Sequence, residues 1–596
     1  MKQLFQLILV FLLLTGITSC KKDFLEKTPL DKYSEGAVWG DPALATTFVN
    51  NIYLGIPYPF TSLMLSSTVD ESMAVWDWES SNVTKSLLTP SYLAIFDNTF
   101  WTSSLRDQTW VKMYVQIRAC NLFLEKIDAV PFDDKAKQDK LKGEVLFLRA
   151  FFYHKLVAYY GGVPLITQAY TLTDEFAVPR DTFEKCIKFI SDECDKAAAL
   201  LPLTDDKARA TKGAALALKS RTLLYAASDL YNSNASWAGS YANKELIGYT
   251  GGDRTARWQA AKAAAKAVID LGIYNLYGGE NPASPQAASE NYANIFLNKG
   301  NEEDIFIQFW DVTHDAASWD RGKPGLFNGP NGWHNWGGNT PIGQLADSYE
   351  MISGNKFDWS NPVIAADPYK DRDPRFYATM LYEGAQWRPR PTDVIAADPK
   401  GIVQVGFYTK PDGTIVPGLD TKKSPIEDWN GGNTGYYLRK FIDPKIDHQY
   451  NSQDLPWRHF RYAEVLLNYA EACLALNLED EAKTYINKIR KRAGMPVVTE
   501  TGAALVARYR NERRVELAYE QHRYYDVRRW MIGPEAYSDA KGVNVTGTLN
   551  PNGTITGRTY SLITSQARAW NPRFYLMPIK LDEINRNNKL VQNPLY

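Results

Sequence analysis

Long stretches with helical spacing of apolar residues fill the first half of the chain and return near its end. Apolar residues recur every three or four positions, which predicts amphipathic helices. The first set of predicted helices covers residues 44–56, 109–128, 140–164, 182–202, 211–231 and 255–272. The second set covers residues 460–477, 479–494 and 505–530, the last as one long helix. Neighbouring helices joined by short turns favour antiparallel helix pairs, and tetratricopeptide-type units of ~34 residues fit their length.

The stretch between the two sets has a different character. Residues 275–455 are rich in Gly, Pro, Asn, Asp and Trp, with short strand-like runs such as residues 304–310. A segment of this length is too long for a single loop, so it predicts an irregular subdomain with short strands and helices. From these patterns alone the predicted fold is mainly α, either a set of helical repeats or an irregular α scaffold, with a loop-rich subdomain.

The N-terminus indicates export. Lys2 precedes an apolar run that reaches Leu14, and small residues then lead to Cys20, the layout of a secretory signal peptide. The run is shorter than the ~20 residues that span a bilayer. The alternatives are an ordinary signal peptide with an incidental cysteine, or a short membrane anchor. The residues before Cys20 resemble a bacterial lipobox, so we expect cleavage there and acylation of Cys20, which anchors the protein to a membrane.

These patterns divide the chain into five parts. We expect a signal peptide, a tether, an N-terminal helical region with a binding loop near residues 70–101, the irregular ligand-binding subdomain, and a C-terminal helical region with an extended tail. Their bounds are residues 1–19, 20–43, 44–274, 275–455 and 456–596.

Composition narrows the functional classes. The 596 residues carry a net charge of −1 and are 45% apolar, which argues against a general binder of nucleic acids or anionic membranes. Cys186 and Cys194 stand eight residues apart in one predicted helix, about 12 Å at the helical rise. A disulfide requires Cα atoms within ~7 Å, so this pair should stay unbridged.

Two tryptophan-rich stretches are candidate ligand-binding sites. A protein that holds a sugar without cleaving it needs exposed aromatic faces with amides, carboxylates or Arg at their edges. In the first stretch Trp76 and Trp78 alternate, so an extended segment would project both to one side. Asp77 and Asn82 lie beside them, and Trp101 could flank the same site.

The second stretch lies within a Gly- and Asn-rich region. Its candidate ligand contacts are Trp319, Arg321, Trp333, His334, Asn335 and Trp336. The alternative is that these tryptophans fill the small core of an irregular subdomain, which we favour for Trp310, at the end of a predicted strand, and for Trp110, on a helical stripe. For Trp333 and Trp336 we favour binding, because large rings exposed on a flexible polar loop usually indicate a partner.

Catalytic signatures are weak. The six His residues are scattered, and the sequence has no HExxH, CxxC, G-x-S-x-G or Walker motif, so we expect no metal site and no cofactor. The acids at positions 302–304 and 70–71 could form a glycosidase pair, but a solvated turn or the edge of a binding cleft is the preferred interpretation. Residues 367–375 predict a turn held by Asp and Arg side chains rather than a calcium loop.

The segment from Arg508 to Trp530 holds seven Arg with aromatic residues between them. Such a stripe could bind nucleic acid. Interleaved acids, among them Glu512, Glu516 and Glu520 at four-residue spacing, instead favour a helix laced with ion pairs.

Several segments together resemble one family. They include "FLRAFFYHKLVAYYGGVPL", "RDPRFYATM", "INKIRKRAGMP", "RNERRVELAYEQHRYYDVRRW" and the closing "FYLMPIKLDEINRNNKLVQNPLY". From Cys20 to Tyr596 the chain is similar to the SusD/RagB family of Bacteroidetes outer-membrane lipoproteins. The resemblance implies four tetratricopeptide-like helix pairs and a loop-rich ligand-binding subdomain. It also implies a partner, a SusC-like TonB-dependent β-barrel transporter, over whose extracellular mouth the lipoprotein lies as a lid.

The leading hypothesis is a non-catalytic glycan-binding lipoprotein of the cell outer membrane. It would face the extracellular side, capture oligosaccharide or polysaccharide, and deliver it to the transporter. The second hypothesis keeps this role with peptide cargo, which the Trp-rich stretches disfavour because peptide capture depends more on backbone hydrogen bonds. The third hypothesis is a cell-surface glycoside hydrolase, which activity on a polysaccharide would establish.

Overall fold

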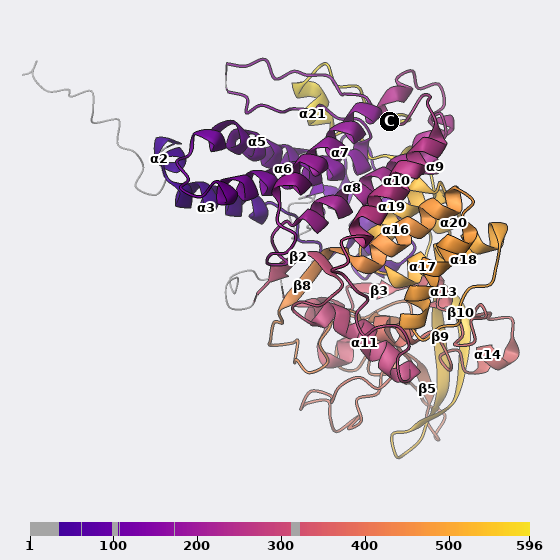
Figure 1. Ribbon diagram of the computed structural model, residues 1–596. Coiled ribbons are helices and arrows are strands. Elements are labelled where there is room, and N and C mark those ends of the chain that lie inside the picture. The colour runs from indigo at the N-terminus through magenta and orange to yellow at the C-terminus, as the bar shows by residue number, and fades with distance from the viewer. Residues whose placement is uncertain (1–34, 61, 98–104, 106–107, 172, 312–321) are drawn as a thin grey trace, which may run out of the picture.

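The computed structural model describes residues 35–60, 62–97, 105, 108–171, 173–311 and 322–596. A stack of helices occupies one half of the molecule and an irregular assembly of short strands and helices occupies the other (Figure 1). The predicted mainly α fold with a loop-rich subdomain is confirmed.

The helices of the N-terminal half follow the predicted order and pack in sequence, α5 on α6, α6 on α7, α7 on α8 and α8 on α10. The helices that build this half are α2 (Glu35–Gly40), α3 (Pro42–Leu54), α5 (Trp110–Lys126), α6 (Lys135–Tyr160), α7 (Phe183–Leu200), α8 (Lys212–Ala227), α9 (Asp229–Asn232) and α10 (Arg254–Ile269). Cys120, Cys186 and Cys194 are buried free thiols, so the prediction that the latter pair stays unbridged is confirmed.

Helix α6 shows how the sequence sets the bounds of these elements. The Asp134 side chain accepts a hydrogen bond from the Ala136 N–H at 2.9 Å and caps the first turn. Gly161 then ends the helix with φ of 76°. A Cβ at this position would lie 2.6 Å from the Leu246 carbonyl oxygen, so both the conformation and the close approach require glycine.

The loop-rich half contains short elements. Those between residues 72 and 438 are β1 (Ser72–Ala74), α4 (Asp77–Thr84), α11 (Pro285–Leu297), β2 (Asp304–Trp310), α12 (Pro324–Asn328), β3 (Asn339–Pro341), α13 (Gly343–Ser348), α14 (Pro362–Ala366), α15 (Pro374–Thr379), β4 (Met380–Tyr382), β5 (Phe407–Thr409), β6 (Ile415–Pro417) and β7 (Tyr436–Leu438). Trp310 is buried in a core that this half shares with β8, and Trp110 is buried among the helices, as expected for both.

The C-terminal part returns to the helical stack and then crosses to the loop-rich half. Its elements are β8 (Leu455–Arg461), α16 (Tyr462–Ala475), α17 (Glu479–Arg492), α18 (Gly502–Glu516), α19 (His522–Arg529), α20 (Gly533–Ala536), β9 (Ala540–Leu549), β10 (Ile555–Gln566) and α21 (Leu581–Arg586). Helix α16 packs on both α10 and α17 and so continues the stack. The hairpin of β9 and β10, which the sequence analysis did not predict, joins β5 and β6 in a four-stranded sheet with the order β10-β9-β5-β6.

The prediction of one long helix over residues 505–530 is wrong. Helix α18 ends at Glu516 and α19 begins at His522, because Tyr519 and Gln521 between them take left-handed conformations with φ of 65° and 68°. The break frees the Tyr519 N–H from helical bonding. It donates instead to a carboxyl oxygen of buried Glu71 at 3.0 Å, so a distant segment stabilises the break.

Candidate ligand-binding site

Two short strands bring the predicted tryptophan stretches together. β1 pairs antiparallel with β3, with Ala74 opposite Asn339, and the Val75 N–H donates to the Gly338 carbonyl at 2.8 Å. Trp76 follows β1 and Trp336 precedes β3, so this register places the two rings side by side. Their centroids are 5.7 Å apart in an edge-to-face arrangement, the geometry that aromatic pairs prefer.

A third tryptophan joins them from a loop that a buried amide holds in place. The Nδ2 atom of fully buried Asn331 lies 2.7 Å, 2.9 Å and 3.1 Å from the carbonyl oxygens of Thr421, Glu427 and Asn430. The loop so fixed carries Trp429, whose ring centroid lies 6.2 Å from that of Trp336. Trp429 is 62% exposed, an unusual position for so large an apolar ring.

Trp76, Trp336 and Trp429 form a row that we call the aromatic platform. Phe327 supports it from α12, with its ring 5.3 Å from that of Trp336. Trp76 and Trp336 are half-buried and Trp429 is open to solvent. Such a row offers stacking faces at low conformational-entropy cost, because each tryptophan has only two side-chain torsions.

Polar groups lie on the same two loops and on a third loop that carries Asp393. His334, two residues before Trp336, has Nδ1 3.0 Å from Glu427 Oε1 and Nε2 3.0 Å from Asp393 Oδ2. Asn430 donates to the other oxygen of Glu427 at 3.2 Å. Asp393 is 63% exposed. These groups can accept and donate hydrogen bonds beside the platform, as hydroxyl-rich ligands require.

The expectation that Trp333 is exposed for binding is wrong. The Trp333 side chain is 1% exposed, and its Nε1–H donates to the Pro389 carbonyl at 3.0 Å. The guanidinium of Arg390 lies 3.5 Å from the ring centroid. Burial by itself would lower the pKa of Arg390, but ion pairs with Asp420 and Asp398 outweigh burial and raise it. Trp333 is therefore part of the core of the loop-rich half.

Asn335 is also buried, at 3% exposure, so it too lies inside rather than on the surface. Adjacent positions of one loop thus have opposite environments. The short helical turn Asn331–Trp333 directs Trp333 inward, and the left-handed His334 that follows it, with φ of 57°, reverses the chain before Trp336. No sequence pattern reveals this reversal.

The expectation that Trp76 and Trp78 alternate along an extended segment is wrong as well, because α4 begins at Asp77. The side chains of Asp77 and Trp78 lie outside the described residues. Trp101, Trp319 and Arg321 lie outside them too. Asn82 on α4 donates to the hydroxyl of Tyr92 at 3.0 Å, and its role in binding stays a prediction.

The sequence analysis missed Trp429. A signal for it exists in "EDWNGGN", where a tryptophan stands between an acid and an Asn-Gly-Gly turn. The stretch "GWHNWGGN" around Trp336 also sets a tryptophan close to a Gly-Gly-Asn turn, with Asn335 in place of the acid. Comparing the two would have identified Trp429 as a second loop tryptophan.

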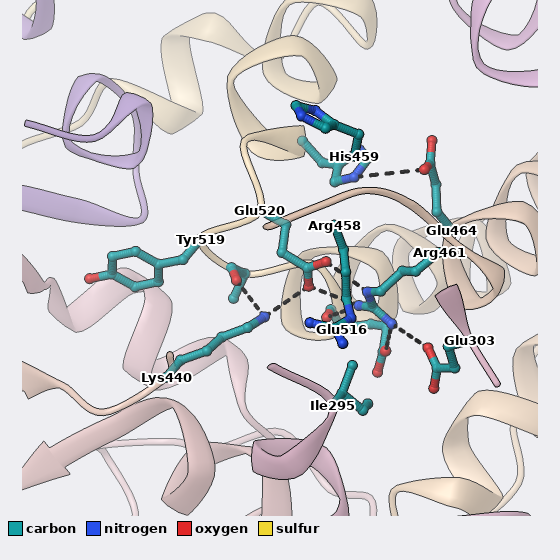
Figure 2. Close-up of polar contacts among 12 residues, drawn as sticks. Ile295, Glu303, Lys440, Arg458, His459, Arg461, Glu464, Glu516, Tyr519 and Glu520 are labelled. Atoms are coloured by element: carbon teal, nitrogen blue, oxygen red, sulfur yellow. Dashed lines mark hydrogen bonds and ion pairs between the residues drawn. The ribbon is translucent and has the colours of Figure 1, made fainter. Parts of the chain in front are cut away.

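Most of the suggested acids have a different role from the one expected. Glu302 is exposed in a turn, as expected. Glu303 and Asp304 are fully buried, and Asp70 and Glu71 are 4% and 1% exposed, so these four form neither a solvated turn nor the edge of a cleft. Figure 2 shows Glu303 within a group that we call the buried ion-pair cluster. Its members are Glu303, Lys440, Arg461, Glu516 and Glu520.

Arg461 is the centre of this cluster. Its Nη1 lies 3.0 Å from Glu303 and 2.7 Å from Glu516, and its Nε lies 2.7 Å from Glu520. Lys440 Nζ contacts the other oxygen of Glu520 at 2.8 Å. The prediction of ion pairs around α18 is correct in kind. Within the cluster, however, the partners come from the turn before β2, from β8 and from a loop, and the pairs are buried rather than on one helix face.

The pKa values of Glu516 and Lys440 in the cluster are both lowered, for different reasons. Burial by itself would raise the pKa of Glu516, but Arg492, Arg461 and Arg375 outweigh burial and lower it. Burial lowers the pKa of Lys440 to about 8, with Glu520 opposing the shift. The arrangement stabilises the junction between β8, α18 and the loop-rich half.

Two further searches covered only the part of the chain that the structure describes. In that part no group of three or more His, Cys, Asp or Glu side chains could hold a metal ion. None of the helices in the same residues is both long enough and apolar enough to cross a membrane.

Comparisons with known proteins agree with this architecture. A family model described as the SusD family matches residues 302–596. A second model, described as "Starch-binding associating with outer membrane", matches residues 23–224. The two matches lie on either side of residue 300 and do not overlap.

A crystal structure of a SusD-like protein from Bacteroides fragilis is 30% identical, covers 96% of this chain and 100% of its own, and superposes with a TM-score of 0.74. SusD-like protein P38 from Formosa agariphila is 23% identical over 75% of each chain. Surface glycan-binding protein A from Bacteroides thetaiotaomicron, solved in complex with laminarihexaose, is 17% identical with a TM-score of 0.58 and covers 93% of this chain and 99% of its own. That last similarity is one of fold.

Proposed function

This chain belongs to the SusD family, and we propose that it is a non-catalytic protein that captures oligosaccharide or polysaccharide on the aromatic platform. The observation that carries this proposal is Trp429, an exposed ring that lies in a row with Trp336 and Trp76. The chain fixes this exposed ring through Asn331 rather than leaving it on a loose loop, which supports a binding role.

The chemistry of the platform suits a sugar. A pyranose presents flat patches of C–H that pack on aromatic faces and a rim of hydroxyls that need hydrogen-bond partners. The carboxylates of Glu427 and Asp393 accept such bonds, and His334 is held between them at 3.0 Å from each. Binding of this type breaks no bond. The relative solved with laminarihexaose supports a glycan as cargo.

The location follows from the N-terminus and the family. We propose that Cys20 is lipidated and anchors the chain to the cell outer membrane, facing the extracellular side. The description of the second family model as associating with the outer membrane supports this location. The proposed partner is a SusC-like TonB-dependent β-barrel, to which the protein delivers its glycan. Pull-down of such a transporter by the lipidated protein, but not by Cys20→Ala, tests both the anchor and the partner.

A binding screen tests the cargo. The chain from residue 21 onward is run through native gels that contain plant, microbial and host polysaccharides. The expected result is retardation by one class of neutral or hydroxyl-rich glycan, and its loss in a Trp336→Ala/Trp429→Ala double variant. Phe176→Ala is a matched control, because Phe176 is 60% exposed and lies on the helical half.

The outcomes are distinct. Equal retardation of the parent and the double variant would keep glycan binding but reject the aromatic platform as its site. Absence of retardation by every glycan, together with binding of peptides, would replace glycan with peptide cargo. Release of reducing sugar from a retarding glycan would overturn the non-catalytic role.

A further inference from the structure

A concave site lies on the helical half and shares no residue with the aromatic platform. It is a pocket of about 360 Å³ between α9, α10, α16, α18 and the end of α19. We call it the Arg510 pocket. The charged and aromatic residues that line it include Asp229, Arg254, Trp258, Tyr509, Arg510 and Trp530. Its volume is in the range of pockets that hold small organic ligands.

The floor of the pocket is aromatic, and the polar atoms of Trp530 and Tyr509 already have partners. Trp258 and Trp530 are 8% and 5% exposed. The Trp530 Nε1–H donates to Glu471 at 2.7 Å, and the Tyr509 hydroxyl lies 2.8 Å from the same carboxylate. Burial would raise the pKa of Glu471, but Arg529 outweighs it and the pKa is lowered to about 2. Glu471 is therefore ionised and already bonded to Arg529, Trp530 and Tyr509. The surface that the floor offers to a ligand is made of ring carbon atoms.

The rim carries an excess of positive charge. Arg254 binds Asp229 at 2.6 Å and also donates to the Ala227 carbonyl at 3.1 Å. The guanidinium of Arg510 lies 3.8 Å from the same Asp229, which is too far for a hydrogen bond. It stacks 5.0 Å from the ring centroid of Trp530. Two arginines therefore share a single carboxylate at this rim.

Arg510 is the unusual member of this group. Its side chain is 33% exposed and makes no hydrogen bond to any residue in the described ranges. A guanidinium offers five N–H donors in a fork that matches a carboxylate. The ring face beneath Arg510 holds this fork at the mouth of the pocket, so its donors remain available above an apolar floor.

We propose that the Arg510 pocket binds a carboxylate attached to an apolar or aromatic body. The carboxylate pairs with the fork of Arg510, and the body lies on Trp258 and Trp530. A two-pronged contact of this type fits a planar carboxylate and is among the stronger hydrogen-bonded pairs. The carboxylate can belong to a free acid or to the C-terminus of a peptide, and the test below distinguishes these sources.

The first measurement is calorimetric titration with N-acetyl-L-phenylalanine and with its uncharged amide. We expect the acid to bind and the amide to bind at least about tenfold more weakly, because a charge-assisted contact is lost. Arg510→Gln should weaken binding of the acid by a similar factor. Asp229→Asn should tighten it, because Arg254 and Arg510 lose their competing internal carboxylate. Arg586→Gln, at an arginine that is 70% exposed on α21, is the matched control and should change nothing.

Arg510→Gln and Asp229→Asn have opposite expected effects on binding of the acid, so either variant can test the proposal if the other folds poorly. Thermal unfolding of each variant checks folding beforehand. The proposal is overturned if acid and amide bind equally, if folded Arg510→Gln binds like the parent, or if neither ligand binds. A peptide ending in Phe with a free C-terminus, compared with its amidated form, identifies the source. Tighter binding of the free peptide than of the acetylated amino acid supports a peptide ligand, and equal binding supports a small acid.

Discussion

The aromatic platform and the buried ion-pair cluster are both assembled from segments hundreds of residues apart, yet they use their side chains in opposite ways. In the platform Trp429 is 62% exposed and lies with its ring tilted against that of Trp336. In the cluster Arg461 is 1% exposed and contacts three carboxylates. The residue types themselves predict the reverse, since tryptophan is usually buried and arginine exposed. The two regions differ in how far partners within the protein cover their side chains. In the cluster each charged group contacts a group of opposite charge, whereas in the platform Trp429 stays largely open to solvent.

The largest expected effect comes from breaking the cluster. Arg461→Met leaves the carboxylates of Glu303, Glu516 and Glu520 buried with fewer cations, and should lower the free energy of unfolding by about 3–5 kcal/mol. Denaturant unfolding at neutral pH measures it. Lys188→Met is the control, since Lys188 and Asp192 form an exposed pair that should contribute less than about 1 kcal/mol. A loss for Arg461→Met as small as that of the control would show that water replaces the guanidinium.

A comparison within the platform loops comes next. Trp333→Ala removes a fully buried ring and should cost about 3–5 kcal/mol of stability. Trp429→Ala removes an exposed ring of the same kind and should change stability by less than about 0.5 kcal/mol. Thermal unfolding of both variants provides the measurement. Similar losses in the two would contradict the assignment of one ring to the core and the other to the surface.

Glu71 connects the two regions, because it precedes β1 and accepts the Tyr519 N–H beside α18. Burial raises the pKa of Glu71 from 4.5 to about 8. Between pH 4.5 and about 8, Glu71 therefore carries a proton in the folded state but not in the unfolded state. The stability that this proton contributes is complete below pH 4.5 and is lost as pH rises through about 8. Glu71→Gln should be neutral at pH 4.5 and stabilising, by about 3–5 kcal/mol, at pH 9. Unfolding curves of both proteins across this range check it, and a constant difference with pH would refute the raised pKa.

The smallest expected effect is on glycan affinity, and it tests which part of Trp429 contacts the ligand. Trp429→Ala should weaken binding of the retarding glycan by about 1 kcal/mol, roughly fivefold, while Trp429→Phe should retain most of the affinity because a stacking face remains. Isothermal titration with an oligosaccharide of that glycan measures the difference. Equal losses in the two variants would indicate that the indole N–H, not the ring face, makes the contact.

Much of the helical half could be predicted from the sequence. Apolar spacing located α5, α6, α7, α8 and α10, and Gly161 marked the end of α6, since helix periodicity and caps are local properties. The joint occurrence of several motifs also predicted the family, which the comparisons confirmed. The two tryptophan stretches were recognised as candidate sites because their ring and amide content is visible in the sequence.

Only the tertiary structure decided which side chains face solvent in the loop-rich half. Whether Trp333 or Trp336 is exposed depends on a reversal at His334 and on the pairing of β1 with β3, which joins segments about 260 residues apart. The end of α18 likewise depends on Glu71, which is distant in sequence and accepts the freed N–H of Tyr519. Local sequence sets helices because their hydrogen bonds close within four residues, whereas burial in irregular regions is set by partners that local patterns do not identify.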